Sequence, residues 1–238
     1  MISTKKMNVP SRWLALALLI GLYACNKKDN VLPATTVTDI DGNVYRFVTI
    51  GKQIWMAENL KTTHYNNKTK IQDGQSDAAW NDNNNGKTGA YCWYNRKNGQ
   101  PDSLTKEYGR LYNFYAVKTG NLCPIGWHVP NKQDWAVLAD TLYEMGLNYT
   151  SVIMDKKWPG EKVSNLTGLS LLPNDYRENP LFIKMPSMAH QWLSDIHSDN
   201  EGVKLKIDNN SNILTISLLL GITASDNYCG YPVRCVKD

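Results

Sequence analysis

The sequence contains few of the residues that metal and redox sites use. It has four histidines, none in an HxH or HExxH spacing, and five cysteines, none in a CxxC pair. Zinc sites gather cysteine and histidine ligands at short spacings, so we expect no metal and no cofactor. The apolar stretch at residues 13–22 is shorter than the roughly 20 residues that a transmembrane helix needs.

The start of the chain has the layout of a signal peptide. Three cations and no acid precede the apolar stretch. The stretch ends in Leu22-Tyr23-Ala24-Cys25, which resembles the lipobox cut by lipoprotein signal peptidase. We expect a signal over 1–24, lipid on Cys25, a polar tether over 25–36 and a domain over 37–238. An ordinary secretory signal is the alternative.

Without this leader the chain has no surplus of either charge. Removing its three cations from 26 basic residues leaves 23, against 22 acidic residues. We expect no nucleic-acid partner, because such surfaces concentrate basic residues. The membrane is therefore expected to be a partner only through lipid on Cys25. Asn26 stands where an Asp retains some lipoproteins in the inner membrane. This favours the outer membrane, facing the periplasm or the cell surface.

Four cysteines remain beyond Cys25, namely Cys92, Cys123, Cys229 and Cys235. An even number in an exported domain favours disulfides over a metal cluster. Four cysteines allow three connectivities, and their spacing alone does not choose among them.

Short strand signals dominate the rest of the chain. β-branched, apolar and aromatic runs predict strands at 44–50, 53–57, 91–94, 191–194, 203–207, 213–220 and 233–236. The first two runs and the pair 203–207 and 213–220 read as hairpins. A helix is predicted over 132–145, after the N-cap Asn131, and a shorter one within 108–117. The pattern indicates an α+β fold.

Residues 66–90 are rich in Asn, Asp, Gly and Lys, which predicts a long surface loop. Residues 81–86 partly match a calcium loop, but Cys92 stands where an EF-hand needs Glu. A solvated turn is the expectation, and a looser calcium site is the alternative.

The aromatic residues are eight Trp and thirteen Tyr against three Phe. Trp and Tyr pack irregular backbone, and they are also frequent at binding surfaces. Trp80 and Trp158 lie in polar stretches and are the candidate exposed aromatics. Together with Asn81 and Asp82 they are the candidate ligand-binding residues. The alternative is that each ring fills a loop core.

Four sequence blocks in order are WMAENL at 55–60, YGRLYNFYA at 108–116, CPIGWHVP at 123–130 and VRCVKD at 233–238. Together they resemble the Fibrobacter succinogenes major paralogous domain, a family of exported, often lipid-anchored bacterial domains. Asn174-Asp175 after Pro173 departs from the glycine usual there. The pattern is also distantly similar to the C-type-lectin-like fold of formylglycine-generating enzymes. That similarity implies a compact domain of short antiparallel strands, two helices and long loops, with the terminal strands together.

The same similarity implies a Cys123–Cys235 bridge, which leaves Cys92 and Cys229 as the second pair. For function, we expect a non-catalytic binding module at the cell envelope, with a glycan or a surface protein as ligand. A structural subunit of a surface assembly is the alternative. A formylglycine-generating-like enzyme is less favoured. Its chemistry needs a reactive cysteine pair near the end of the chain, for which Cys229 and Cys235 are the candidates. Cys235, however, matches the structural Arg-Cys strand at the end of that fold, and no second reactive cysteine block precedes it.

Overall fold

The computed structural model describes residues 35–94, 103–147, 152–159, 163–208 and 228–238. These residues belong to one unit, Thr35–Asp238. The predicted signal peptide, Cys25 and most of the tether lie outside the described residues, as does the predicted strand 213–220. No helix within the described ranges is long and apolar enough to cross a membrane.

The described residues form a mixed α+β structure of short elements. The helices are α1 (Asp77–Asn85), α2 (Ser103–Tyr108), α3 (Phe114–Lys118) and α4 (Lys132–Glu144). The strands are β1 (Thr36–Thr38), β2 (Val44–Ile50), β3 (Gln53–Met56), β4 (Gln72–Asp73), β5 (Ala90–Cys92), β6 (Leu111–Tyr112), β7 (Trp127–His128), β8 (Tyr176–Glu178), β9 (Leu181–Ile183), β10 (Met188–Ser198), β11 (Glu201–Asp208), β12 (Cys229–Gly230) and β13 (Val236–Lys237).

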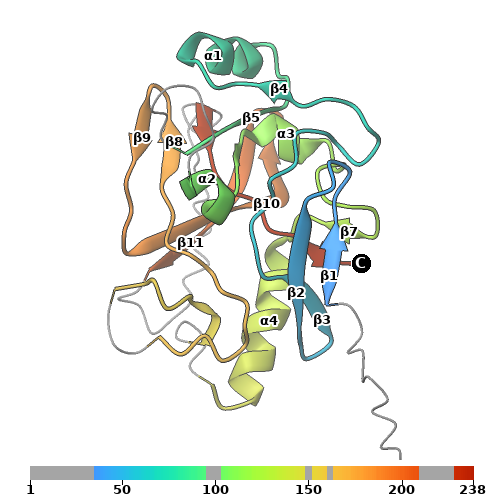
Figure 1. Ribbon diagram of the computed structural model, residues 1–238, viewed down its shortest axis with the longest axis vertical. Coiled ribbons are helices and arrows are strands. Elements are labelled where there is room, and N and C mark those ends of the chain that lie inside the picture. Colours follow the sequence, from blue (N-terminus) through green and yellow to red (C-terminus); the bar gives the residue numbers. More distant parts are fainter. Residues whose placement is uncertain (1–34, 95–102, 148–151, 160–162, 209–227) are drawn as a thin grey trace, which may run out of the picture. The chain divides into compact units, whose positions relative to one another are not determined.

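One sheet joins the two ends of the described domain. Its order is β1-β2-β3-β13-β7, and all its strand pairs are antiparallel. The predicted hairpin is confirmed as β2 and β3, and Val236 of β13 pairs with Trp55 of β3. The N-terminal hairpin and the C-terminal strand β13 therefore lie side by side in one sheet, as the similarity to the lectin-like fold implied (Figure 1).

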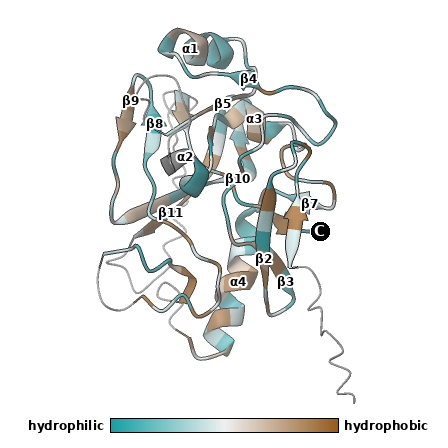
Figure 2. Cartoon of the chain, in the orientation of Figure 1, coloured by the Kyte–Doolittle hydropathy of each residue, from teal (hydrophilic) through white to brown (hydrophobic). Residues whose placement is uncertain are grey.

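Helix α4 confirms the strongest helix prediction. The side chain of Asn131 accepts from the backbone N–H of Asp134, whose carboxylate accepts from the N–H of Asn131, so both ends of a capping box are present. Trp135, Leu138 and Leu142 form its buried face. Hydrophobic and hydrophilic residues alternate along α4 and β2, as expected for elements with one buried face (Figure 2).

The prediction of a surface loop over 66–90 was partly wrong, because this segment contains α1. Ser76 caps this helix by accepting from the N–H of Ala79. The predicted helix within 108–117 was also partly wrong. Tyr112 lies in strand β6 between Tyr91 and Tyr231, and the helix begins only at Phe114. Tertiary strand pairing overrides the helical spacing there.

Three smaller sheets complete the domain. Strands β10 and β11 form a long antiparallel ladder, β12, β8 and β9 form a second sheet, and β4, β5 and β6 form a third with one parallel pair. Strand β11, which contains the predicted strand 203–207, pairs with β10, which contains the predicted strand 191–194. The four helices described exceed the two expected, although only α1 and α4 are longer than two turns.

Candidate ligand-binding pocket

The structure corrects the prediction that Trp80 and Trp158 are exposed. Their exposed fractions are 0% and 2%. The indole N–H of Trp80 donates to the carbonyl of Tyr228 at 2.6 Å, and that of Trp158 donates to the carbonyl of Leu171 at 2.6 Å. Both rings lie in buried hydrophobic clusters and satisfy their polar atom internally, so neither offers a face to a ligand.

Asn81 and Asp82 lie on α1 rather than in a turn. The side-chain oxygen of Asn81 accepts from Asn179 at 2.8 Å, and Asp82 is exposed. No group of three or more His, Cys, Asp or Glu side chains in the described part of the chain is placed to hold a metal ion. The prediction of a solvated turn at 81–86 was wrong. Asn81 and Asp82 also do not share an exposed surface with Trp80 and Trp158, because both tryptophans are buried.

The Cys123–Cys235 bridge is confirmed. It joins the segment before β7 to the residue that precedes β13, and the two cysteines are 112 positions apart in the sequence. Cys92 and Cys229 are both buried, and their pairing stays a prediction.

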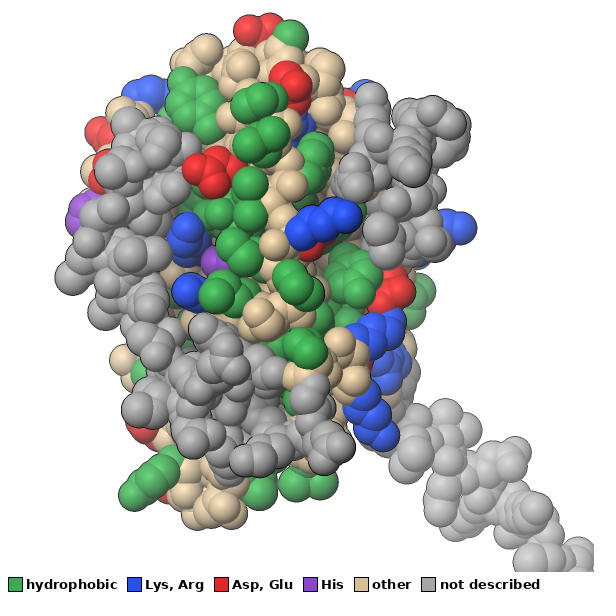
Figure 3. All heavy atoms as spheres, turned by 90° about the vertical axis from the view of Figure 1, so that its left-hand side faces the viewer, with side chains coloured by type: hydrophobic (Ala, Val, Ile, Leu, Met, Phe, Trp, Pro, Cys, Tyr) green, Lys and Arg blue, Asp and Glu red, His purple; other side chains and the backbone are tan. Residues whose placement is uncertain are grey.

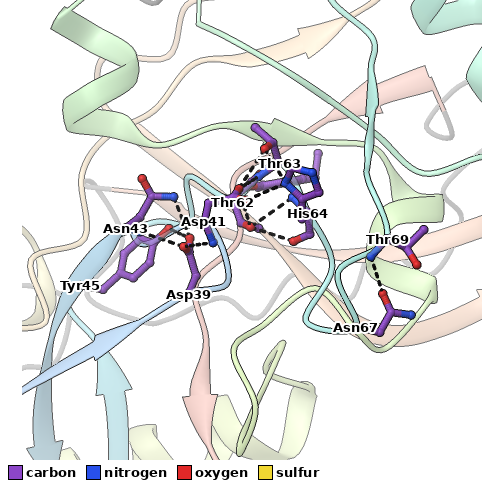
Figure 4. Close-up of polar contacts among 10 residues, drawn as sticks. Asp39, Asp41, Asn43, Tyr45, Thr62, Thr63, His64, Asn67 and Thr69 are labelled. Carbon is purple, nitrogen blue, oxygen red and sulfur yellow. Dashed lines mark hydrogen bonds and ion pairs between the residues drawn. The ribbon is translucent and has the colours of Figure 1, made fainter.

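A polar cluster near β1 and β2 is satisfied from within (Figure 4). The carboxylate of Asp41 accepts from the side chains of Thr62, Thr63 and His64 and from the N–H of Thr63. Although burial opposes it, these hydrogen bonds hold the pKa of Asp41 below its usual range. Because the Asp41 carboxylate already accepts from these donors, this cluster holds the segment at 62–64 in place and leaves few hydrogen-bonding groups for a ligand.

A cavity of about 280 Å³ opens elsewhere on the domain and has a different character. We call it the tyrosine pocket. Its lining comes from five separate segments of the chain and consists of Tyr94, Tyr108, Lys157, Pro173, Asp175, Met185 and Pro186. Strands β8 and β9, which lie next to Asp175 and Met185 in the sequence, are at the left of Figure 1, whereas β1 is at the right. Figure 3 turns that side to the viewer and shows hydrophobic side chains in a band with charged side chains on both flanks.

Tyr94 is the unusual member of the pocket. It follows β5, is 4% exposed, and its hydroxyl finds no hydrogen-bond partner among the described residues. Burial, with the nearby Asp175 carboxylate as a second cause, raises the pKa of Tyr94 well above its usual value, so the phenol stays neutral. The ring of Tyr108, at the end of α2, lies 5.7 Å from that of Tyr94 at an angle of 47°.

Charged groups line the rim of the tyrosine pocket. One carboxylate oxygen of Asp175 accepts from the N–H of Met185 at 3.1 Å. The ammonium of Lys157 lies 6.0 Å from the centre of the Tyr108 ring and forms an ion pair with Glu107. The rim therefore presents a carboxylate beside a cation that already has a partner.

Sequence reasoning missed this pocket. Tyr94 was expected only as part of a buried strand, and Asp175 was noted only as a departure from the family pattern. That departure was the one available signal, because it places a carboxylate where a glycine offers no side chain.

Fold and site define a small disulfide-bonded α+β domain with a compact aromatic pocket on the side away from its first strand. The chain belongs to the Fibrobacter succinogenes major domain family, whose model matches residues 48–237. No curated protein matches the chain, and no solved structure does.

Proposed function

We propose that this protein is a non-catalytic binding module, held at the outer membrane by lipid on Cys25, that takes an envelope ligand in the tyrosine pocket. The single observation that carries this proposal is the buried hydroxyl of Tyr94, which has no partner within the described ranges. Leaving such a group unsatisfied costs about 1–3 kcal/mol. A phenylalanine would fill the same space without that cost, which favours a role for this hydroxyl in binding.

The lining of the tyrosine pocket supports binding. Apolar surface from Pro173, Met185 and Pro186 surrounds a few polar groups, which is the composition of small-molecule sites. The volume of about 280 Å³ lies at the low end for such sites. The pocket therefore suits one ring or one side chain of a larger ligand.

The cysteine chemistry favours binding over catalysis. The formylglycine-generating analogy needs a reactive pair near the end of the chain, for which Cys229 and Cys235 were the candidates. The sulfur of Cys235 is instead bonded to Cys123. A bridged sulfur is not available as the thiolate nucleophile of such chemistry.

The position of the pocket supports display toward the envelope. The described chain begins at Thr35, next to β1, on the opposite side of Figure 1 from β8 and β9. Thr35 is not among the residues that line the tyrosine pocket, so the point where the tether joins the domain does not itself block the pocket.

The test is a blocking substitution with a matched control. Met185→Trp places a large ring in the pocket wall, and Tyr143→Trp places the same ring on the exposed face of α4, where Tyr143 is 82% exposed. The lipidated full chain, kept in detergent micelles, is applied to arrays of envelope oligosaccharides and of peptides. We expect a ligand that the wild type and Tyr143→Trp bind and Met185→Trp does not. If no array member separates the two variants, the proposal is wrong.

A further inference from the structure

The charges around the tyrosine pocket bear on which ligands it accepts. Asp175 lies in the lining, and Asp155 is close enough that, after burial and Asp175, it contributes to raising the pKa of Tyr108. The one lining cation, Lys157, is paired with Glu107. Acidic groups therefore outnumber unpaired basic groups among the described residues here. An anionic ligand would meet repulsion without a cation to offset it.

The hydrogen-bonding groups narrow the ligand further. The neutral phenol of Tyr94 has a proton to donate, and the carboxylate of Asp175 can only accept. A ligand hydroxyl can accept from the Tyr94 phenol and donate to the Asp175 carboxylate through the same oxygen. An ammonium only donates and a carboxylate only accepts, so neither serves both groups.

The apolar wall sets the shape of what enters. Tyr108 is half-buried and presents part of its ring, beside the flat faces of Pro173 and Pro186. An aromatic ring offers a negative face to polarised C–H groups. A pyranose ring combines a C–H face with hydroxyls at its edge, and it matches a wall of this kind with polar groups at one side.

We propose that the tyrosine pocket binds a single uncharged sugar ring of a glycan, with one ring hydroxyl shared between Tyr94 and Asp175 and the C–H face against Tyr108. This assignment rests on the proposed binding function and adds the ligand class. Specificity then comes from the Tyr94 and Asp175 pair, and Tyr108 supplies contact area.

The experiment measures affinities of the full chain for three kinds of monosaccharide probe. The neutral probes are the methyl glycosides of glucose, galactose, mannose and N-acetylglucosamine. Methyl glucuronide carries a negative charge and glucosamine a positive one. Titration calorimetry and saturation-transfer NMR give the dissociation constants, and a peptide array runs in parallel.

At least one neutral glycoside should bind more tightly than both charged probes. Tyr94→Phe should weaken that binding about tenfold, the value of one hydrogen bond at 1.4 kcal/mol. Asp175→Asn keeps the acceptor for the N–H of Met185 and should weaken binding by a similar factor. Tyr112→Phe removes another buried hydroxyl, outside the pocket, and should leave the affinity unchanged.

Other outcomes separate this assignment from the proposed function. If a charged probe binds more tightly, or if Tyr94→Phe does not weaken the neutral probe, the sugar assignment is overturned. The sugar assignment is also overturned if only peptides bind and Met185→Trp abolishes that binding, but this result supports the proposed binding function. If Met185→Trp changes the binding of no probe and no peptide, both the sugar assignment and the proposed binding function are overturned.

Discussion

The rings of Tyr94 and Tyr108 lie 5.7 Å apart and form one side of a small pocket, yet only Tyr108 reaches solvent appreciably. Tyr94 is almost fully buried, and its hydroxyl has no partner within the described residues. The two tyrosines belong to separate elements, since Tyr94 follows β5 and Tyr108 ends α2. The pair brings together two elements whose own folding signals are weak.

The lipid anchor gives the first prediction. Cys25→Ser removes the sulfur that would carry the lipid, so the protein should leave the membrane fraction and appear in the soluble envelope fraction. Intact mass of the wild-type protein should show a chain that begins at Cys25 and carries acyl groups. Two or more acyl chains are needed for stable anchoring, because each buried CH₂ contributes ~0.8 kcal/mol. A Cys25→Ser protein that stays with the membrane would contradict the anchor.

The disulfide gives the second prediction. Cys123 and Cys235 are separated by 112 residues and both are buried. A loop of about that length makes a bridge worth about 4–5 kcal/mol in the chain-entropy model, and measured gains are often smaller. The double variant Cys123→Ala, Cys235→Ala should lose 2–4 kcal/mol of unfolding free energy in urea. Reduced wild-type protein is the control. It loses this bridge and any Cys92–Cys229 bridge, so it should unfold at the same urea concentration as the variant or at a lower one. Equal stability of variant and oxidised wild type would contradict the prediction.

Arg177 gives the third prediction, because it ties α1 to β8. Its buried guanidinium donates to the carbonyls of Gly74 and Gln75 and to Asp77, and it lies 4.7 Å above the ring of Trp80. Arg177→Met leaves buried carbonyls without donors and should cost about 2–4 kcal/mol of unfolding free energy.

The matched control for Arg177 is its exposed partner. The side chain of Asp77 is 57% exposed, and Asp77→Asn keeps an acceptor oxygen, so it should cost under about 1 kcal/mol. Similar losses for both variants in urea unfolding would show that the carboxylate, rather than the backbone contacts, makes this junction stable.

His190 gives the fourth prediction, a dependence of stability on pH. Burial, followed by the charges of Lys204 and Lys206, lowers its pKa from 6.5 to about 3. Between these values the unfolded chain binds a proton that the folded chain does not, so unfolding free energy falls as the pH drops below about 6.5. The slope from this residue approaches about 1.4 kcal/mol per pH unit.

The control for His190 removes the titrating group and keeps a ring. His190 packs against the rings of Tyr176 and Tyr231, with ring centroids at 5.1 and 5.5 Å, and its Nδ1 has no partner within the described residues. His190→Phe should fold and lose less stability than the wild type between pH 6.5 and pH 4. Parallel stability curves for the two proteins would contradict the assignment.

Local signals in the sequence predicted the parts of the fold that short segments determine. The hairpin at 44–57 and helix α4 follow from turn residues, strand-forming side chains and the Asn131 cap. The ordered family blocks predicted the family, and the similarity implied the Cys123–Cys235 bridge. Helix α1 was missed because its sequence is polar, and the hydrogen bond and the cation–π contact of the Trp80 ring are with residues about 100 to 150 positions away.

The tyrosine pocket could not be predicted for a related reason. Its five lining segments meet only after the sheets form, and no spacing in the chain records that meeting. Composition showed that Trp and Tyr are abundant, but it could not show that the tryptophans fill cores while a tyrosine keeps an unsatisfied hydroxyl. Polarity of the neighbouring residues was a poor guide to exposure at Trp80 and Trp158.

The most direct test of the central claim compares Tyr94→Phe with Tyr112→Phe in urea unfolding and in ligand binding. The hydroxyl of Tyr112 donates to the carbonyl of Thr62 at 2.8 Å, so its loss should cost about 1 kcal/mol of unfolding free energy and leave ligand affinity unchanged. Tyr94→Phe should keep or increase the unfolding free energy and should weaken ligand binding. A Tyr94→Phe protein that is less stable than the wild type and binds ligand equally well would contradict the account.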